Sequence, residues 1–96
     1  MAELFQVDDL GHLFISPAIS DWSVVTGRGI DAVIDLDAGV DEGIPTTHNR
    51  QLYVYFPIYD DHLPDPVKLA SVIRLGSHLV ASGHRVLSHC GMGFNR

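Results

Sequence analysis

The chain has 96 residues, which is enough for one small domain with a limited hydrophobic core. Its formal net charge is −6 and only six residues are Lys or Arg, so a broad electrostatic attraction to nucleic acid or to an anionic membrane is not expected. The hydrophobic fraction of 46% is ordinary for a globular chain, and no apolar run approaches the length of a membrane span.

The cysteine count and the N-terminal sequence bear on the cellular compartment. One cysteine cannot form an internal disulfide, which fits a reducing compartment. The first six residues, Met-Ala-Glu-Leu-Phe-Gln, lack a basic segment and a long apolar core, so no signal peptide is expected. We therefore expect a cytoplasmic protein.

The N-terminal third of the chain predicts a hairpin and a short helix. Two short runs of strand-forming residues, 4–7 and 12–15, flank a polar turn, which is typical of a hairpin. A helix over residues 21–26 follows, capped by Ser20 or Asp21 and stopped by nearby glycines.

The middle of the chain predicts two strands joined by a loop. Residues 32–36 read Ala-Val-Ile-Asp-Leu and predict a mostly buried strand. Residues 37–50 are polar and contain glycine, so we expect a loop with room for one helical turn. Apolar residues alternate over 52–58, which predicts a strand, and Pro57 restricts its last part to a strand end.

The clearest element is a helix over residues 65–82. Asp65 is expected to cap it, Pro66 suits its first turn, and Gly83 is placed to end it. A last strand is predicted over residues 86–88, directly before the cysteine.

Together these elements predict an α/β fold, with a central mixed sheet of about five strands and helices packed on it. In such sheets ligands bind beyond the carboxyl ends of the strands. Asp60 and Cys90 both follow predicted strand ends, so one edge of the sheet is expected to gather them.

The last eight residues hold the parts of a phosphate-handling site, and they are His89, Cys90, Gly91, Met92, Gly93, Phe94, Asn95 and Arg96. A thiolate is a good nucleophile. If the chain turns tightly after Cys90, the N–H groups of residues 91–96 can form a nest for an anion, and Gly91 and Gly93 permit a close backbone approach. The planar guanidinium of Arg96 can bind two phosphate oxygens at once, and it would lower the pKa of the Cys90 thiol.

The pattern His89-Cys90-x-x-Gly93-x-x-Arg96 resembles the His-Cys-x5-Arg signature of cysteine-based protein phosphatases, and the chain is most similar to their compact dual-specificity branch. The resemblance implies a phosphatase-like fold and hydrolysis of phosphomonoesters through a phosphocysteine intermediate. It implies that Cys90 attacks phosphorus, that Arg96 and the N–H groups of residues 91–96 bind the phosphoryl oxygens, and that His89 organises the loop. It implies no cofactor.

The family also uses an aspartate about thirty residues upstream to protonate the leaving oxygen. Asp60 lies thirty positions before Cys90 and Asp61 twenty-nine, so both fit that spacing. The family's usual placement favours Asp60, and Asp61 remains the alternative. Two adjacent carboxylates near a dianionic substrate would raise each other's pKa, which suits a general acid.

The resemblance covers residues 1–96 and stops at the motif arginine, so these residues are expected to form a partial dual-specificity phosphatase-like domain without its C-terminal helices. In the family those helices cover one face of the sheet. An apolar sheet surface is therefore expected to need cover from a further C-terminal segment or from a partner.

Two other functions remain open. Rhodanese-like sulfurtransferases also carry a cysteine in a loop after a strand, although they do not need the upstream aspartates. A fragment of this kind can also be a non-catalytic phosphate-binding module or scaffold. For the enzyme, the expected partner is a phosphorylated protein or a small phosphomonoester. A metal site has little support, because the six histidines form no helical i, i+4 pair.

Overall fold

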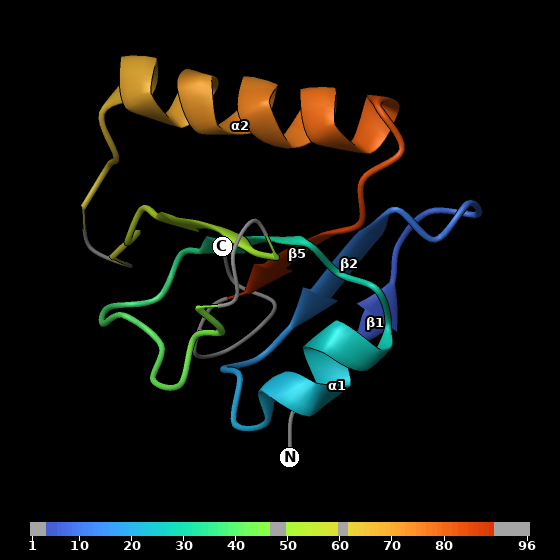
Figure 1. The fold of residues 1–96 in the computed structure, drawn as a ribbon. Coiled ribbons are helices and arrows are strands. Elements are labelled where there is room, and N and C mark those ends of the chain that lie inside the picture. The colour runs from blue at the N-terminus through green and yellow to red at the C-terminus, as the bar shows by residue number, and fades with distance from the viewer. Residues whose placement is uncertain (1–3, 47–49, 60–61, 90–96) are drawn as a thin grey trace.

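The computed structural model describes residues 4–46, 50–59 and 62–89. Two helices and five strands lie within these ranges (Figure 1), in the order β1 (Phe5–Gln6), β2 (Leu13–Ser16), α1 (Trp22–Gly27), β3 (Ala32–Asp35), β4 (Leu52–Tyr55), α2 (Pro66–Ala81) and β5 (Val86–His89). Within the described ranges, neither helix has the length and hydrophobicity needed to cross a membrane.

The five strands form one mixed sheet in the order β1-β2-β5-β3-β4. The pair β1–β2 is antiparallel, and the other three pairs are parallel. The predicted α/β fold with a sheet of about five strands is therefore confirmed. The last strand, β5, lies in the middle of the sheet, where His89 is paired with Ser16 of β2 on one side and with Asp35 of β3 on the other.

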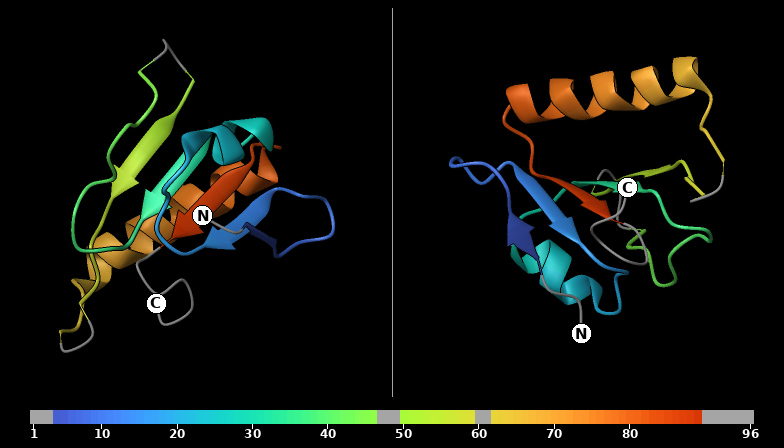
Figure 2. Two further views of the ribbon diagram at one scale, coloured as in Figure 1. Left: turned by 90° about the horizontal axis from the view of Figure 1, so that it is seen from below. Right: turned by 180° about the vertical axis from the view of Figure 1, so that it is seen from behind.

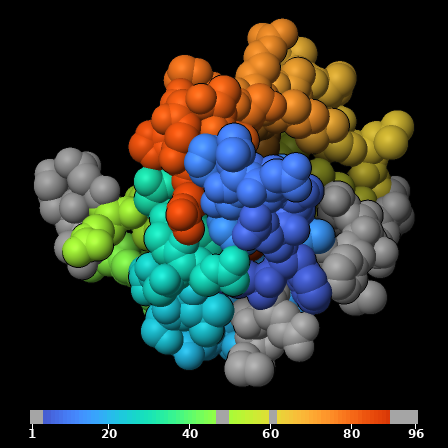
Figure 3. Space-filling view, turned by 90° about the vertical axis from the view of Figure 1, so that its right-hand side faces the viewer, coloured from blue at the N-terminus to red at the C-terminus, as the bar shows by residue number. Residues whose placement is uncertain are grey.

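The helices cover opposite faces of the sheet (Figure 2). Since side chains alternate along a strand, β3 and β5 supply both apolar layers. Val33 and Leu87 pack with Val25 of α1, whereas the neighbouring strand positions pack with α2. In the space-filling view of Figure 3, α2 in orange and yellow and α1 in cyan lie at opposite ends, with the blue hairpin between them.

The predicted helix caps are present. The Asp21 carboxylate accepts a hydrogen bond from the Ser23 N–H at 2.9 Å, so Asp21 rather than Ser20 begins α1. The Asp65 carboxylate accepts the N–H groups of Val67 at 2.9 Å and Lys68 at 3.0 Å, and proline opens α2 as predicted. Both helices therefore begin where side-chain oxygens satisfy N–H groups that have no partner inside the helix.

Some predicted bounds were wrong by a few residues. The strand predicted over 52–58 ends at Tyr55, two residues before Pro57, which has no N–H to donate. The chain still follows β3 for a short distance, because the N–H of Phe56 donates to Asp35 O at 2.9 Å. In the described part of residues 37–50 there is no helical turn. The strand β5 runs one residue beyond the prediction and includes His89.

The packing of α2 on the sheet is incomplete within the described residues. None of its side chains is fully buried, although Val72, Leu79 and Val80 contact the sheet core. A groove of about 490 Å³ lies between the helix and the sheet. Its lining is mainly apolar and comprises Leu13, Ile34, Leu36, Ile58, Leu69, Val72, Ile73, Gly76, Ser77, Val80, Val86 and Ser88.

Candidate functional site

The carboxyl ends of the parallel strands form a polar edge of the sheet. Among the described residues, only three polar or charged side chains are buried, namely Ser16, Asp35 and His89. They are the last residues of β2, β3 and β5, and they are neighbours in the strand register. A buried polar side chain costs free energy unless a hydrogen-bond partner compensates for the lost water. The buried polar residues at this edge are therefore expected to be paired with one another or with neighbouring groups.

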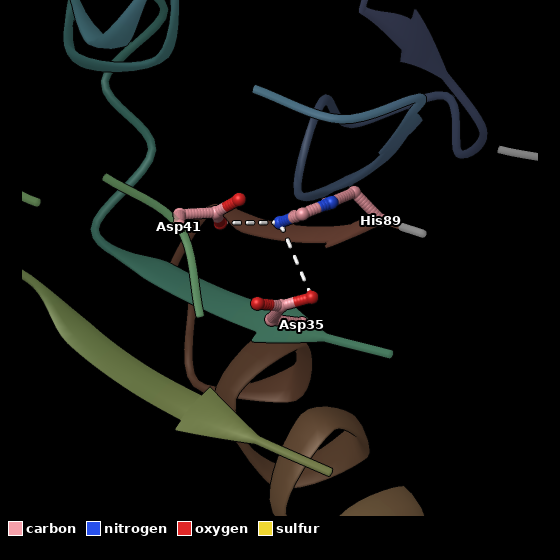
Figure 4. Close-up of side chains that lie close together, drawn as sticks. All are labelled: Asp35, Asp41 and His89. Atoms are coloured by element: carbon pink, nitrogen blue, oxygen red, sulfur yellow. Dashed lines mark hydrogen bonds and ion pairs between the residues drawn. The ribbon is translucent and has the colours of Figure 1, made fainter. Parts of the chain in front are cut away.

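His89 lies between two carboxylates, as Figure 4 shows. Its Nε2 is 2.6 Å from Oδ2 of Asp41, which lies in the loop between β3 and β4, and 3.7 Å from Oδ1 of Asp35. The side chains of His89 and Asp35 are 0% exposed, and that of Asp41 is 9% exposed. A contact of 2.6 Å in such a buried place is a short, charge-assisted hydrogen bond.

Tyr53 of β4 joins the two carboxylates. Its hydroxyl donates to Oδ2 of Asp35 and accepts the backbone N–H of Asp41 at 2.8 Å. Burial and the hydrogen bond to Asp35 raise the pKa of Tyr53, so the hydroxyl keeps its proton and remains a donor. Oδ1 of Asp35 also accepts the N–H of Asp37 at 2.9 Å. Tyr53 therefore holds the carboxylate of Asp35 and the backbone of Asp41 in place.

The environment of Asp41 acts on its pKa in two directions. Burial raises the pKa of the carboxyl, and the neighbouring His89 lowers it by charge and by hydrogen bonding, with the rise prevailing. Asp35 adds to the rise as a second carboxylate nearby.

Asp35, Asp41 and His89 each offer an atom that can bind a metal, and these atoms lie within 4.8 Å of one another. The ligands of a tetrahedral zinc, at about 2.0–2.1 Å from the ion, are separated by about 3.3 Å. The 2.6 Å between Nε2 of His89 and Oδ2 of Asp41 is too short for an ion to bind both. The geometry is that of a hydrogen-bonded cluster, and we call these three residues with Tyr53 the His89 cluster.

Of the site residues predicted from the sequence, only His89 lies in the described part of the chain. It ends the central strand, and Cys90 is the next residue in the sequence. Cys90, residues 91–96, Asp60 and Asp61 lie outside the described residues, so their roles stay predictions. The chain leaving β4 follows the same polar edge, because Ile58 donates its N–H to Leu36 O at 3.0 Å.

Sequence reasoning missed Asp35, Asp41 and Tyr53. The pattern of residues 32–36 predicts only a buried strand for Asp35, residues 37–50 predict only a loop for Asp41, and the alternation over residues 52–58 predicts only a strand for Tyr53. The sequence contained one signal for Asp35. It lies inside the apolar run Ala-Val-Ile-Asp-Leu, and an aspartate is rarely buried in such a strand unless another group pairs with it. The identity of those partners could not be found from spacing, since Asp41 lies 48 residues before His89.

Several solved structures have a fold similar to that of this chain. P. aeruginosa TpbA superposes with a TM-score of 0.73 at 21% sequence identity, over 97% of this chain and 56% of that one. A cysteine-to-serine variant of TpbA in complex with pTyr matches with a TM-score of 0.67. Tk-PTP in its active form matches with a TM-score of 0.66 at 25% identity, over 90% of this chain and 61% of that one.

A human tyrosine phosphatase-like serine/threonine/tyrosine-interacting protein matches with a TM-score of 0.67 at 18% identity, over 97% of this chain and 64% of that one. No family model matches the chain, and no curated protein matches it by sequence. The chain thus has the α/β fold of part of the tyrosine phosphatase-like structures, and it spans about 56–64% of the length of these structures.

Proposed function

We propose that this chain carries the nucleophile and phosphate-binding loop of a cysteine-dependent phosphomonoester hydrolase, a protein tyrosine or dual-specificity phosphatase. One observation carries the proposal. The central strand β5 ends at His89 on the buried polar edge of a phosphatase-like sheet, and the next residue begins the sequence Cys90-x5-Arg96. Ligands bind beyond this edge in sheets of this type.

The proposed reaction has two steps. The thiolate of Cys90 attacks phosphorus and forms a phosphocysteine, while the bond to the leaving oxygen breaks and Asp60 gives that oxygen its proton. Water then attacks the phosphocysteine as Asp60 takes a proton from it, which releases inorganic phosphate and restores the thiolate. Arg96 and the N–H groups of residues 91–96 stabilise the charge on the phosphoryl oxygens in both steps. Asp61 is the alternative acid.

We propose phosphorylated protein as the substrate class, with phosphotyrosine first. The similar TpbA structure in complex with pTyr supports this class. The five residues between Cys90 and Arg96 are uncharged, so the proposed loop offers one guanidinium to one phosphate group. A nucleophilic thiol also needs a reducing compartment, and we propose the cytoplasm for that reason.

The decisive experiment compares the full-length protein with its Cys90→Ser variant on para-nitrophenyl phosphate. The serine hydroxyl is not ionised at neutral pH, so turnover should fall to background, while phosphate binding should be largely kept because the backbone N–H groups and Arg96 remain. Isothermal titration with phosphotyrosine measures that binding. A serine variant that retained most of the turnover rate would refute nucleophilic catalysis by Cys90.

A non-catalytic binding protein is the second candidate. One of the similar structures is named as a phosphatase-like interacting protein, which supports this alternative. Binding of phosphotyrosine without turnover in the unmodified protein would favour it. The structures named above are phosphatases or phosphatase-like proteins, so the sulfurtransferase alternative has less support; a thiosulfate assay beside the phosphatase assay separates the two.

A further inference from the structure

A hollow of about 240 Å³ lies between the chain that leaves β4 and the first turn of α2. It is lined by residues 56–59 and 62–65 and by Lys68, and most of these side chains are apolar or aromatic. Two of them extend into solvent, since Leu63 is 97% exposed and Tyr59 is 50% exposed. Exposed apolar side chains gathered at a hollow are typical of a binding surface.

Lys68 is the only lysine in the chain, and it stands where a helix does not favour a cation. Because Asp65 is the N-cap, Lys68 is the third residue of α2. The N-terminal end of a helix carries a partial positive charge, so an acidic side chain stabilises this turn and a lysine does not. Lys68 is exposed and forms no ion pair with the residues that the structure describes. The stability of the helix therefore does not explain this lysine.

Asp65 is the only acidic side chain that lines the hollow. Its Oδ1 accepts the N–H groups of Val67 at 2.9 Å and Lys68 at 3.0 Å, so its carboxylate is engaged with the backbone of the helix. The ammonium group of Lys68 is thus available to a carboxylate from another molecule. Apolar walls strengthen such a pair, because they keep water away from the charges.

The hollow lies close to the end of the central strand. Leu36 donates its N–H to His89 O at 2.8 Å, and Leu36 O accepts the N–H of Ile58 at 3.0 Å. Leu36 therefore lies between the end of β5 and a wall of the hollow. Since neighbouring strands are about 4.8 Å apart, Ile58 lies roughly 10 Å from His89, and an extended peptide covers this distance in about three residues.

We propose that Lys68 is a specificity-determining residue, which binds the carboxylate of an acidic residue about three positions from the phosphotyrosine of a peptide substrate. The inference rests on the function proposed above. The bound residue is acidic because Lys68 is a permanent cation without an ion-pair partner in the described part of the chain. Tyr59 and Leu63 offer apolar surface to the stem of the same residue.

The test uses the full-length protein and phosphotyrosine peptides that carry Glu, Gln or Lys three positions before or three positions after the phosphotyrosine. The variants are Lys68→Gln, Lys68→Glu and the conservative Lys68→Arg. Arg74→Gln is the matched control, because it removes the same charge from an exposed position on α2 that does not line the hollow. For each peptide, kcat/KM is divided by the value for para-nitrophenyl phosphate, which has no flanking residues, so a general change in activity cancels.

In one of the two series, the unmodified protein should prefer the Glu peptide over the Gln peptide by about threefold, the size expected of an ion pair at an exposed site. Lys68→Gln should remove this preference, Lys68→Glu should favour the Lys peptide, and Lys68→Arg should keep the original order. Arg74→Gln should change the preference by less than about 1.5-fold, because salt screens a charge that is not in contact with the peptide.

The absence of a preference in both series would overturn the proposal, and so would a lower melting temperature of Lys68→Gln with an unchanged preference. An equal loss in Arg74→Gln would assign the preference to the overall charge of the protein and would overturn the proposal too. No turnover of para-nitrophenyl phosphate would refute the proposed function instead. The Kd values of the same peptides, measured by fluorescence anisotropy, would then decide on Lys68, and equal Kd values for the Glu, Gln and Lys peptides would refute its role.

Discussion

At the scale of single residues, the sequence located the reactive end of the chain but not the side chains that support it. His89 could be placed at a strand end because the predicted strand over residues 86–88 stands directly before it. Asp35, Asp41 and Tyr53 could not be connected with it, because their contacts join segments that lie 12 to 54 residues apart in the sequence. Such contacts are set by strand order, which local patterns do not contain.

The general acid gives a prediction at this scale. Asp60→Asn should slow hydrolysis strongly, by about a hundredfold or more, for alkyl or phenyl phosphates, whose leaving oxygen needs a proton. For para-nitrophenyl phosphate, whose leaving group is stable as an anion, the loss should be much smaller. The measurement is kcat for both substrates, and Asp61→Asn is the matched control. Equal losses on both substrates would exclude Asp60 as the acid, and a selective loss in Asp61→Asn would assign the role to Asp61.

At the scale of elements, capping chemistry was readable from the sequence, whereas strand length was not. Asp65 is the predicted cap of α2, and Asp21 is one of the two predicted caps of α1, since a capping carboxylate acts on N–H groups only two or three residues away. The end of β4 was predicted too late, because the alternation of apolar residues continues past Tyr55, although the backbone pairing stops there.

The cap of α2 gives a measurable consequence. Asp65 accepts two backbone N–H groups, so Asp65→Ala should lower the free energy of unfolding by about 1 kcal/mol. Asp65→Asn keeps an acceptor oxygen and should cost less than half as much. Urea unfolding followed by circular dichroism measures both variants. Equal losses in the alanine and asparagine variants would show that the carboxylate charge, and not the cap, is what matters.

The hairpin predicts a dependence of stability on pH. The carboxylate of Asp8 accepts the N–H groups of Leu13 and His12, each at 2.8 Å, and these bonds hold the pKa of Asp8 below its ordinary value. A carboxyl with a lowered folded pKa stabilises the protein above its unfolded pKa of 3.8, and this stabilisation is lost as pH falls through the folded value.

Asp8→Asn should therefore be less stable than the unmodified protein at pH 7, and the difference should shrink as the pH is lowered below about 4. Urea midpoints at pH 7, 5 and 3 measure this difference, with Asp9→Asn as the neighbouring control. A difference that stays constant over the three pH values would contradict the assignment of the bonds to the ionised form.

At the scale of the whole molecule, the alternation of predicted strands and helices indicated the α/β class. The same pattern did not predict that β5 lies between β2 and β3 in the sheet. That insertion makes the last strand the centre of the sheet and buries His89. It also creates the two apolar layers, because Val86 and Leu87 face opposite helices. An apolar groove also runs between α2 and the sheet. The similar structures are longer than this chain and contain residues that it does not match.

The charge of the molecule predicts its substrate preference. The net charge is −6, and the five residues between Cys90 and Arg96 carry no charge, so a substrate with several phosphate groups would be repelled by the protein as a whole and would find no added cation in the proposed loop. A phosphotyrosine peptide presents one phosphate on an apolar ring and avoids both penalties.

In the full-length protein, kcat/KM for such peptides should exceed that for polyphosphorylated inositol lipids by about tenfold or more at low salt, and the ratio should shrink as added salt screens the repulsion. Parallel assays at 20 and 300 mM salt, roughly a fourfold change in Debye length, measure both effects. A preference for the lipids, or a ratio that does not respond to salt, would show that something other than electrostatic repulsion selects the substrate.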